Sequence, residues 1–120
     1  MISGDRQMRI IGTVLDGCMQ RHKVIASNLA NIETPGYKRL EVRFEEQLAA
    51  AVENGDDREL DEVEFAPRPS EGLPVRPDGN NVDFGTELGE MSKNTLLYST
   101  FAQLAASRIR QYREAMGESS

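Results

Sequence analysis

The chain has 120 residues, of which only 38% are hydrophobic and none is Trp, so it carries little material for a self-sufficient core. Its formal net charge is −6, and the excess of acid falls between residues 32 and 82. Because nucleic acids and anionic membranes attract basic surfaces, we expect neither nucleic-acid binding nor direct membrane insertion.

The first predicted element is a helix over residues 5 to 31, with Ser3 or Asp5 as its cap. Its apolar residues recur in alternating steps of three and four, which is a heptad pattern with one polar member. The members of this pattern are Met8, Ile11, Leu15, Cys18, His22, Ile25, Leu29 and Ile32.

Pro35 and Gly36 predict the end of this helix near Asn31, because proline disfavours a helical residue before it and the Pro-Gly pair fits a type II turn. Asn28 and Asn31 lie one turn apart near that end. We expect their side-chain amides to hold the last helical carbonyls or the backbone of the turn.

The middle of the chain predicts a short helix at about residues 41–53, ending at Asn54-Gly55. Acidic residues and four prolines then follow closely. This composition favours an extended, partly disordered segment over residues 53–77.

A second long helix is expected after Asp83, which is a plausible N-cap. Leu97, Phe101 and Leu104 form an additional apolar line on an adjoining face, so this helix is expected to have more than one neighbour. Its heptad pattern consists of Leu88, Met91, Thr95, Tyr98, Ala102, Ala105, Ile109, Tyr112 and Met116.

The predicted fold is therefore mainly α, with two long terminal amphipathic helices pairing as a coiled-coil-like hairpin. The segments are residues 1–37 for the first helix and its turn, 38–82 for the intermediate part, and 83–120 for the second helix. The positions expected to pack within or between subunits are Leu15, Ile25, Leu29, Leu88, Met91, Asn94, Leu97, Tyr98, Leu104, Ala105 and Ile109.

Cys18 and His22 are four residues apart on one helical face, as a thiol nucleophile and its base would be. Both also belong to the heptad pattern, and no third group is placed to orient the His. We therefore favour packing roles for both and expect no catalytic residue. One His, one Cys and the lack of a phosphate-binding loop predict no metal and no cofactor.

Residues 26–38 resemble the signature of flagellar rod and hook proteins, in which an Asn-rich helix end meets a Thr-Pro-Gly-Tyr turn. The residues that carry this motif are Asn28, Leu29, Asn31, Thr34, Pro35, Gly36 and Tyr37. The run from Asp78 to Asp83 and the helix after it are similar to the proximal rod subunits, as is the short chain length.

The resemblance implies a non-enzymatic subunit of the bacterial basal-body rod, polymerising with copies of itself and other rod proteins into a tube that transmits torque around an export channel. It also implies delivery to the periplasm by the flagellar type III export apparatus, without a cleaved signal peptide. Two alternatives are a cytoplasmic coiled-coil adaptor or chaperone-like binder, and a small thiol enzyme using Cys18 and His22.

Overall fold

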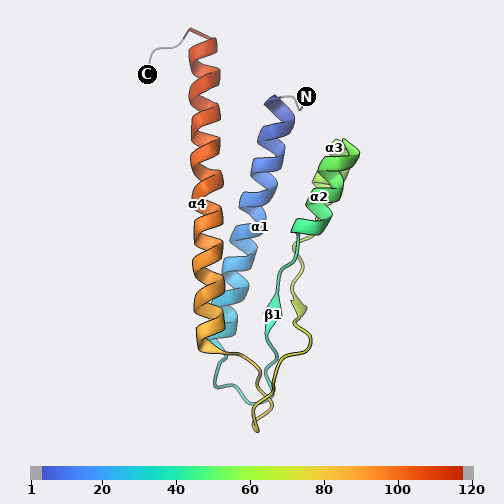
Figure 1. Cartoon of the computed structure of the whole chain (residues 1–120), viewed down its shortest axis with the longest axis vertical. Coiled ribbons are helices and arrows are strands. Elements are labelled where there is room, and N and C mark those ends of the chain that lie inside the picture. Colours follow the sequence, from blue (N-terminus) through green and yellow to red (C-terminus); the bar gives the residue numbers. More distant parts are fainter. Residues whose placement is uncertain (1–3, 118–120) are drawn as a thin grey trace.

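The computed structural model describes residues 4–117, and it is mainly helical (Figure 1). A pair of two-residue strands is the only sheet in this part of the chain. The elements are α1 (Gly4–Ala30), β1 (Leu40–Glu41), α2 (Glu45–Asn54), α3 (Asp57–Asp61), β2 (Arg68–Pro69) and α4 (Phe84–Ala115).

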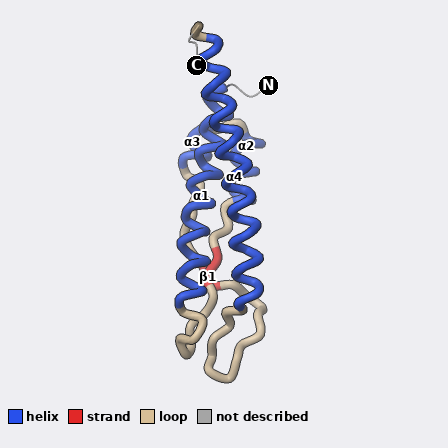
Figure 2. Tube along the Cα trace, turned by 90° about the vertical axis from the view of Figure 1, so that its left-hand side faces the viewer, coloured by secondary structure: helices blue, strands red, loops and turns tan. Residues whose placement is uncertain are grey.

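The two long helices, α1 and α4, run antiparallel and side by side (Figures 1 and 2). They give the molecule extents of 63 × 32 × 15 Å and a radius of gyration of 17.9 Å. A compact globule of this length would have a radius of gyration of about 14 Å. The predicted helical hairpin is confirmed, and it gives the molecule an elongated shape.

The ends of the long helices follow the residues that predict them. Helix α1 ends at Ala30, and the amide of Tyr37 donates to the carbonyl of Thr34 at 3.2 Å, closing a turn in which Gly36 has a φ of 77°. This is the expected type II geometry. At the start of α4, the carboxylate of Asp83 accepts from the amide of Thr86 at 2.8 Å, and this hydrogen bond lowers the pKa of Asp83.

The middle segment differs from the prediction of an extended, partly disordered linker. Helix α2 begins at Glu45 rather than near residue 41, because Leu40 and Glu41 pair antiparallel with Pro69 and Arg68. Its C-terminal end is as expected, with Gly55 in the left-handed conformation at a φ of 69°.

The acidic run contains α3, which sequence reasoning missed. Asp56 caps this short helix by accepting from the amide of Arg58. Two α1 cations face its acids, since Arg6 pairs with Asp57 and Arg9 with Asp61. These cations of α1 offset the repulsion among the acidic side chains, which was the reason to expect disorder. Leu60 and Val63 of the same segment are part of the hydrophobic core.

The hydrophobic core lies between α1 and the middle segment rather than along the seam of α1 and α4. Phe44 is its centre, with the Phe65 ring edge-on at 5.8 Å and the Arg21 guanidinium 4.7 Å above the ring. The buried members of this core are Val14, Cys18, Val24, Val42, Phe44, Leu48, Ala51, Leu60 and Val63.

Over residues 4–117, none of the helices combines the length and the apolar character needed to cross a bilayer.

Candidate functional site: a polar clasp and two uncovered apolar surfaces

Asn28 joins three parts of the chain at the end of α1. Its fully buried amide donates to the carbonyl of Leu40 at 2.8 Å and to Glu87 at 3.2 Å. Its oxygen accepts from the amide of Leu40 at 3.0 Å and from the hydroxyl of Tyr37 at 2.9 Å. Because every polar atom of this amide is satisfied, Asn28 fixes where the chain returns after the turn.

Glu87 of α4 belongs to the same cluster, and its side chain is fully buried. It forms an ion pair with Arg39, whose side chain is also largely buried. Arg39 in turn donates to the hydroxyl of Ser70 at 2.8 Å, and its backbone amide donates to the side chain of Asn81 at 2.6 Å. The charge of Glu87 is therefore compensated inside the molecule by a cation that is itself held in place.

A second turn, formed by residues 76–80, packs against the turn that follows α1 at the lower end in Figure 1. The fully buried Asn80 donates to the carbonyls of Asn31 and Thr34, both at 2.9 Å. Gly79 has a φ of 86°, and a Cβ there would lie 3.2 Å from the Cα of Gly36. We call these two turns, with Asn28, Arg39 and Glu87, the clasp.

The motif residues expected to end α1 meet in this clasp. Asn31 donates to the carbonyl of Ser27 at 2.8 Å, and the hydroxyl of Thr34 donates to Asn31 at 3.1 Å. Sequence reasoning missed the roles of Arg39, Asn80 and Glu87. The Asp-Gly-Asn-Asn run of residues 78–81 is typical of a turn, but no local pattern shows that it would pack on the other turn.

The clasp also determines which face of α4 meets α1. Glu87 and Asn94 are the buried residues of α4, and the amide of Asn94 donates to the carbonyl of Cys18 at 2.8 Å. Glu87, Asn94 and Phe101, which are seven residues apart, thus face α1. Each lies one position before a member of the predicted heptad pattern, which includes Leu88. The heptad apolar residues lie at the flank of the contact instead of at its centre.

The predicted packing positions are divided accordingly. Ile25 and Asn94 are buried, while Leu15, Leu29, Met91, Leu97 and Ala105 are partly buried. Four apolar positions on α4 stay exposed, namely Leu88 (43%), Tyr98 (40%), Leu104 (40%) and Ile109 (44%). Each of these four residues keeps about two-fifths of its surface exposed, and covering this apolar surface with another molecule would be favourable.

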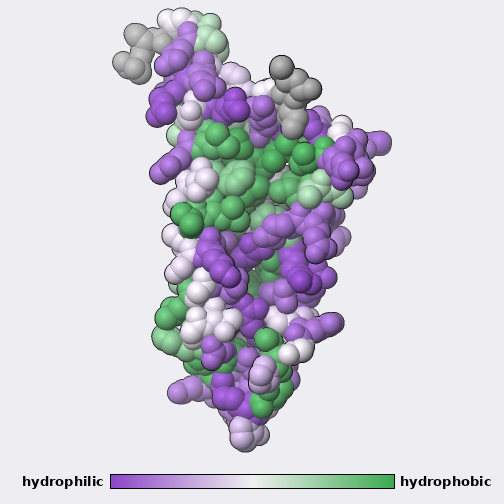
Figure 3. All heavy atoms as spheres, viewed as in Figure 1, coloured by the Kyte–Doolittle hydropathy of each residue, from purple (hydrophilic) through white to green (hydrophobic). Residues whose placement is uncertain are grey.

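One apolar surface is a groove lined by residues of α1, α2 and α4. Figure 3 shows apolar side chains gathered on the upper half of this face. The groove has a volume of about 450 Å³ and carries the carboxylates of Glu45 and Glu53 at its edge. Its apolar lining, which we call the α2-side groove, consists of the partly buried Ile10, Val52, Leu97 and Phe101 together with the buried core residues Val14, Phe44 and Leu48.

A second uncovered surface lies on the other flank of α4. It consists of Leu88, Tyr98, Ile109 and Met116, which we call the α4 stripe. Beside it is a hollow of about 280 Å³, to which α1 contributes Met19, His22 and Lys23. Leu97 follows Leu88 by nine residues, and at about 100° per residue these two side chains point to opposite sides of α4.

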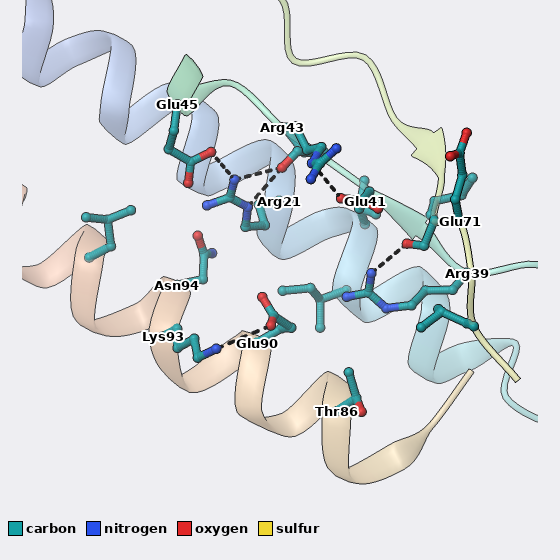
Figure 4. Close-up of a pocket in the computed structure, with 17 residues that line it drawn as sticks. Arg21, Arg39, Glu41, Arg43, Glu45, Glu71, Thr86, Glu90, Lys93 and Asn94 are labelled. Carbon is teal, nitrogen blue, oxygen red and sulfur yellow. Dashed lines mark hydrogen bonds and ion pairs between the residues drawn. The ribbon is translucent and has the colours of Figure 1, made fainter. Parts of the chain in front are cut away.

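A third hollow, of about 570 Å³, lies between the helix pair and β1 (Figure 4). Its charged side chains are mostly paired with one another: Arg21 with Glu45 at 2.6 Å, Arg43 with Glu41 at 3.1 Å and Lys93 with Glu90 at 3.6 Å. Burial raises the pKa of Glu45, but the hydrogen bond and charge of Arg21 outweigh it and the pKa is lowered. We attribute these charges to joining the segments around the hollow.

Cys18 and His22 lie in different surroundings. Cys18 is buried, and burial raises the pKa of its thiol against the opposing effect of Arg21. His22 is exposed at the hollow beside the α4 stripe. A thiol with a raised pKa is a poor nucleophile, so this geometry favours a packing role for Cys18.

Among residues 4–117, no three His, Cys, Asp or Glu side chains gather as metal ligands would.

Comparison with known proteins gives a consistent result. The family described as "Flagella basal body rod protein" matches residues 19–38, which cover the end of α1 and the turn. The flagellar basal body rod protein FlgB of Borrelia hermsii is 34% identical over 110 aligned positions, covering 77% of this chain and 82% of that protein. FlgB of Cereibacter sphaeroides is 38% identical over 98 positions, covering 74% and 77%. FlgB of Escherichia coli K12 is 26% identical over 123 positions, covering 88% and 89%.

Proposed function

Because this chain belongs to the FlgB family of flagellar basal body rod proteins, we propose that it works by assembly, with its long helices packing against neighbouring rod subunits. It is a structural component of the flagellar rod and not an enzyme. This membership replaces the alternatives of a coiled-coil adaptor and a small thiol enzyme.

The observation that best supports this proposal is the exposed apolar surface of the α4 stripe. Helix α4 has 32 residues, and its only buried residues are the polar Glu87 and Asn94. Its apolar residues on the stripe remain exposed. Apolar side chains such as Ile109 each gain on the order of 1 kcal/mol or more when they are removed from water. Covering the stripe with another subunit would supply the apolar burial that the single chain lacks.

The remaining steps follow from the family and from the shape of the chain. An elongated hairpin with different surfaces on its two flanks can join head to tail, and such a contact continues into a tube rather than closing as a dimer. We propose that this tube surrounds the export channel and transmits torque, that the subunit reaches the periplasm through the flagellar type III apparatus, and that its neighbours are copies of itself and other rod proteins.

The proposal is tested by the variants Leu88→Asp and Ile109→Asp in a flagellated cell that lacks the unmodified chain. A charge placed on the stripe would be buried on assembly, so both variants should be lost from isolated basal bodies and the cells should not swim. Val75→Asp is the matched control, because Val75 is 54% exposed but lies off α4. Normal incorporation of both stripe variants would refute the proposal.

A further inference from the structure

We propose that the α4 stripe of one copy packs into the α2-side groove of the next copy, so that one chain carries both halves of a repeating contact. This inference rests on the proposed function and names the partner of the stripe. The partner is a second copy of this chain, because the charges beside the two surfaces are complementary.

The two surfaces are on opposite flanks of the same helix pair. On α4, Leu88 of the stripe and Leu97 of the groove are half a turn apart. On α1, Val14 lines the groove and Met19 lies by the stripe, and the five-residue step between them turns about 140°. One chain therefore cannot bring its own stripe into its own groove, whereas a neighbour translated sideways can.

The charges at the edges of the two surfaces are opposite. Arg113 follows Ile109 of the stripe by one helical turn, and Lys23 lies by the hollow beside it. Glu53 stands at the edge of the groove. Within residues 4–117, none of these three charged groups forms an ion pair. A neighbour docked stripe to groove would place its Arg113 beside Glu53, and this pairing fixes the register of the contact.

The surfaces also match in chemistry. The groove is an open channel with a mainly apolar floor of Ile10, Val52 and Phe101, and the stripe is a row of large apolar side chains on one helix. The members of the stripe recur every seven to eleven residues along α4, and an apolar helix face is the kind of occupant that an apolar groove accepts. The contact is heterologous, so each added copy presents a new groove or a new stripe for the next.

The test is charge reversal with incorporation into isolated basal bodies as the readout. Glu53→Lys alone and Arg113→Glu alone should each lower incorporation several-fold, because each places like charges together. A chain with both changes should recover incorporation close to that of the unmodified protein. Glu62→Lys, at an exposed carboxylate outside the groove, is the matched control and should incorporate normally.

Cysteine cross-linking tests the same contact directly, in a Cys18→Ala background. Cells producing a mixture of Glu53→Cys and Arg113→Cys chains should yield a cross-linked dimer in isolated basal bodies after mild oxidation. Rods that assemble without this dimer, together with a double reversal no better than the weaker single, would overturn the inference and leave the proposed function intact. Normal incorporation of the Leu88→Asp and Ile109→Asp variants would instead remove the proposed function.

Discussion

Glu87 of α4 and Arg39, two residues beyond the turn after α1, form an ion pair in which Glu87 is fully buried. Removing one member of a buried pair leaves the other charge uncompensated, and this costs about 3–5 kcal/mol. Glu87→Ala and Arg39→Ala should therefore each lower the free energy of unfolding strongly. Chemical denaturation followed by circular dichroism measures the effect.

A double variant measures the interaction energy between the two side chains, apart from the effect of each side chain alone. Arg39→Ala with Glu87→Ala should cost less than the sum of the two single changes, because no lone charge remains. The exposed pair of Arg43 and Glu41 is the matched control and should contribute no more than about 1 kcal/mol. An additive double variant would show that the two side chains act independently.

Asn28 should prove equally sensitive. Asn28→Ala leaves the amide and carbonyl of Leu40 without their partner, and an unsatisfied buried polar group costs about 1–3 kcal/mol. Asn54→Ala is the control, since exposed Asn54 only bonds Glu59 at the surface, and it should change stability by less than about 0.5 kcal/mol. Equal unfolding midpoints for the two variants would contradict this role of Asn28.

Helix α1 offers two glycines with opposite expected responses. A Cβ at Gly17 would lie 2.5 Å from the Phe44 ring, so Gly17→Ala should displace that ring and destabilise the protein by about 1–3 kcal/mol. Gly12 has open space, and Gly12→Ala should stabilise the helix by up to about 1 kcal/mol. Thermal unfolding of both variants gives the sign, and stabilisation by Gly17→Ala would mean that Phe44 does not pack there.

Gly79 should be less replaceable than Gly72. Both have a positive φ, which costs a non-glycine residue about 1–2 kcal/mol, but only at Gly79 would a Cβ press on another backbone, at 3.2 Å from Gly36. Gly79→Ala should therefore destabilise more than Gly72→Ala. Similar losses in denaturation experiments would show that the two turns are not in close contact.

Local signals predicted the ends of the long helices because Pro35, Gly36 and Asp83 act on their immediate neighbours. The clasp depends on pairs far apart in the chain, such as Arg39 with Glu87, and glutamate is normally exposed, so its sequence context gave no warning of burial. The same reason explains α3, whose acids are compensated by Arg6 and Arg9 about 50 residues earlier. The heptad pattern of α4 identified its apolar residues. Because Glu87 and Asn94 face α1, many of these apolar residues lie beside the α1 contact and not within it.

The proposed function depends on burial of the α4 stripe when the rod assembles. Its most direct measurement is the rate at which a maleimide labels Ile109→Cys, in a Cys18→Ala background, in the free chain and in isolated basal bodies. We expect ready labelling of the free chain, where Ile109 is 44% exposed, and strong protection in the basal body. Equal labelling rates in the two states would contradict it, because the stripe would then remain in water after assembly.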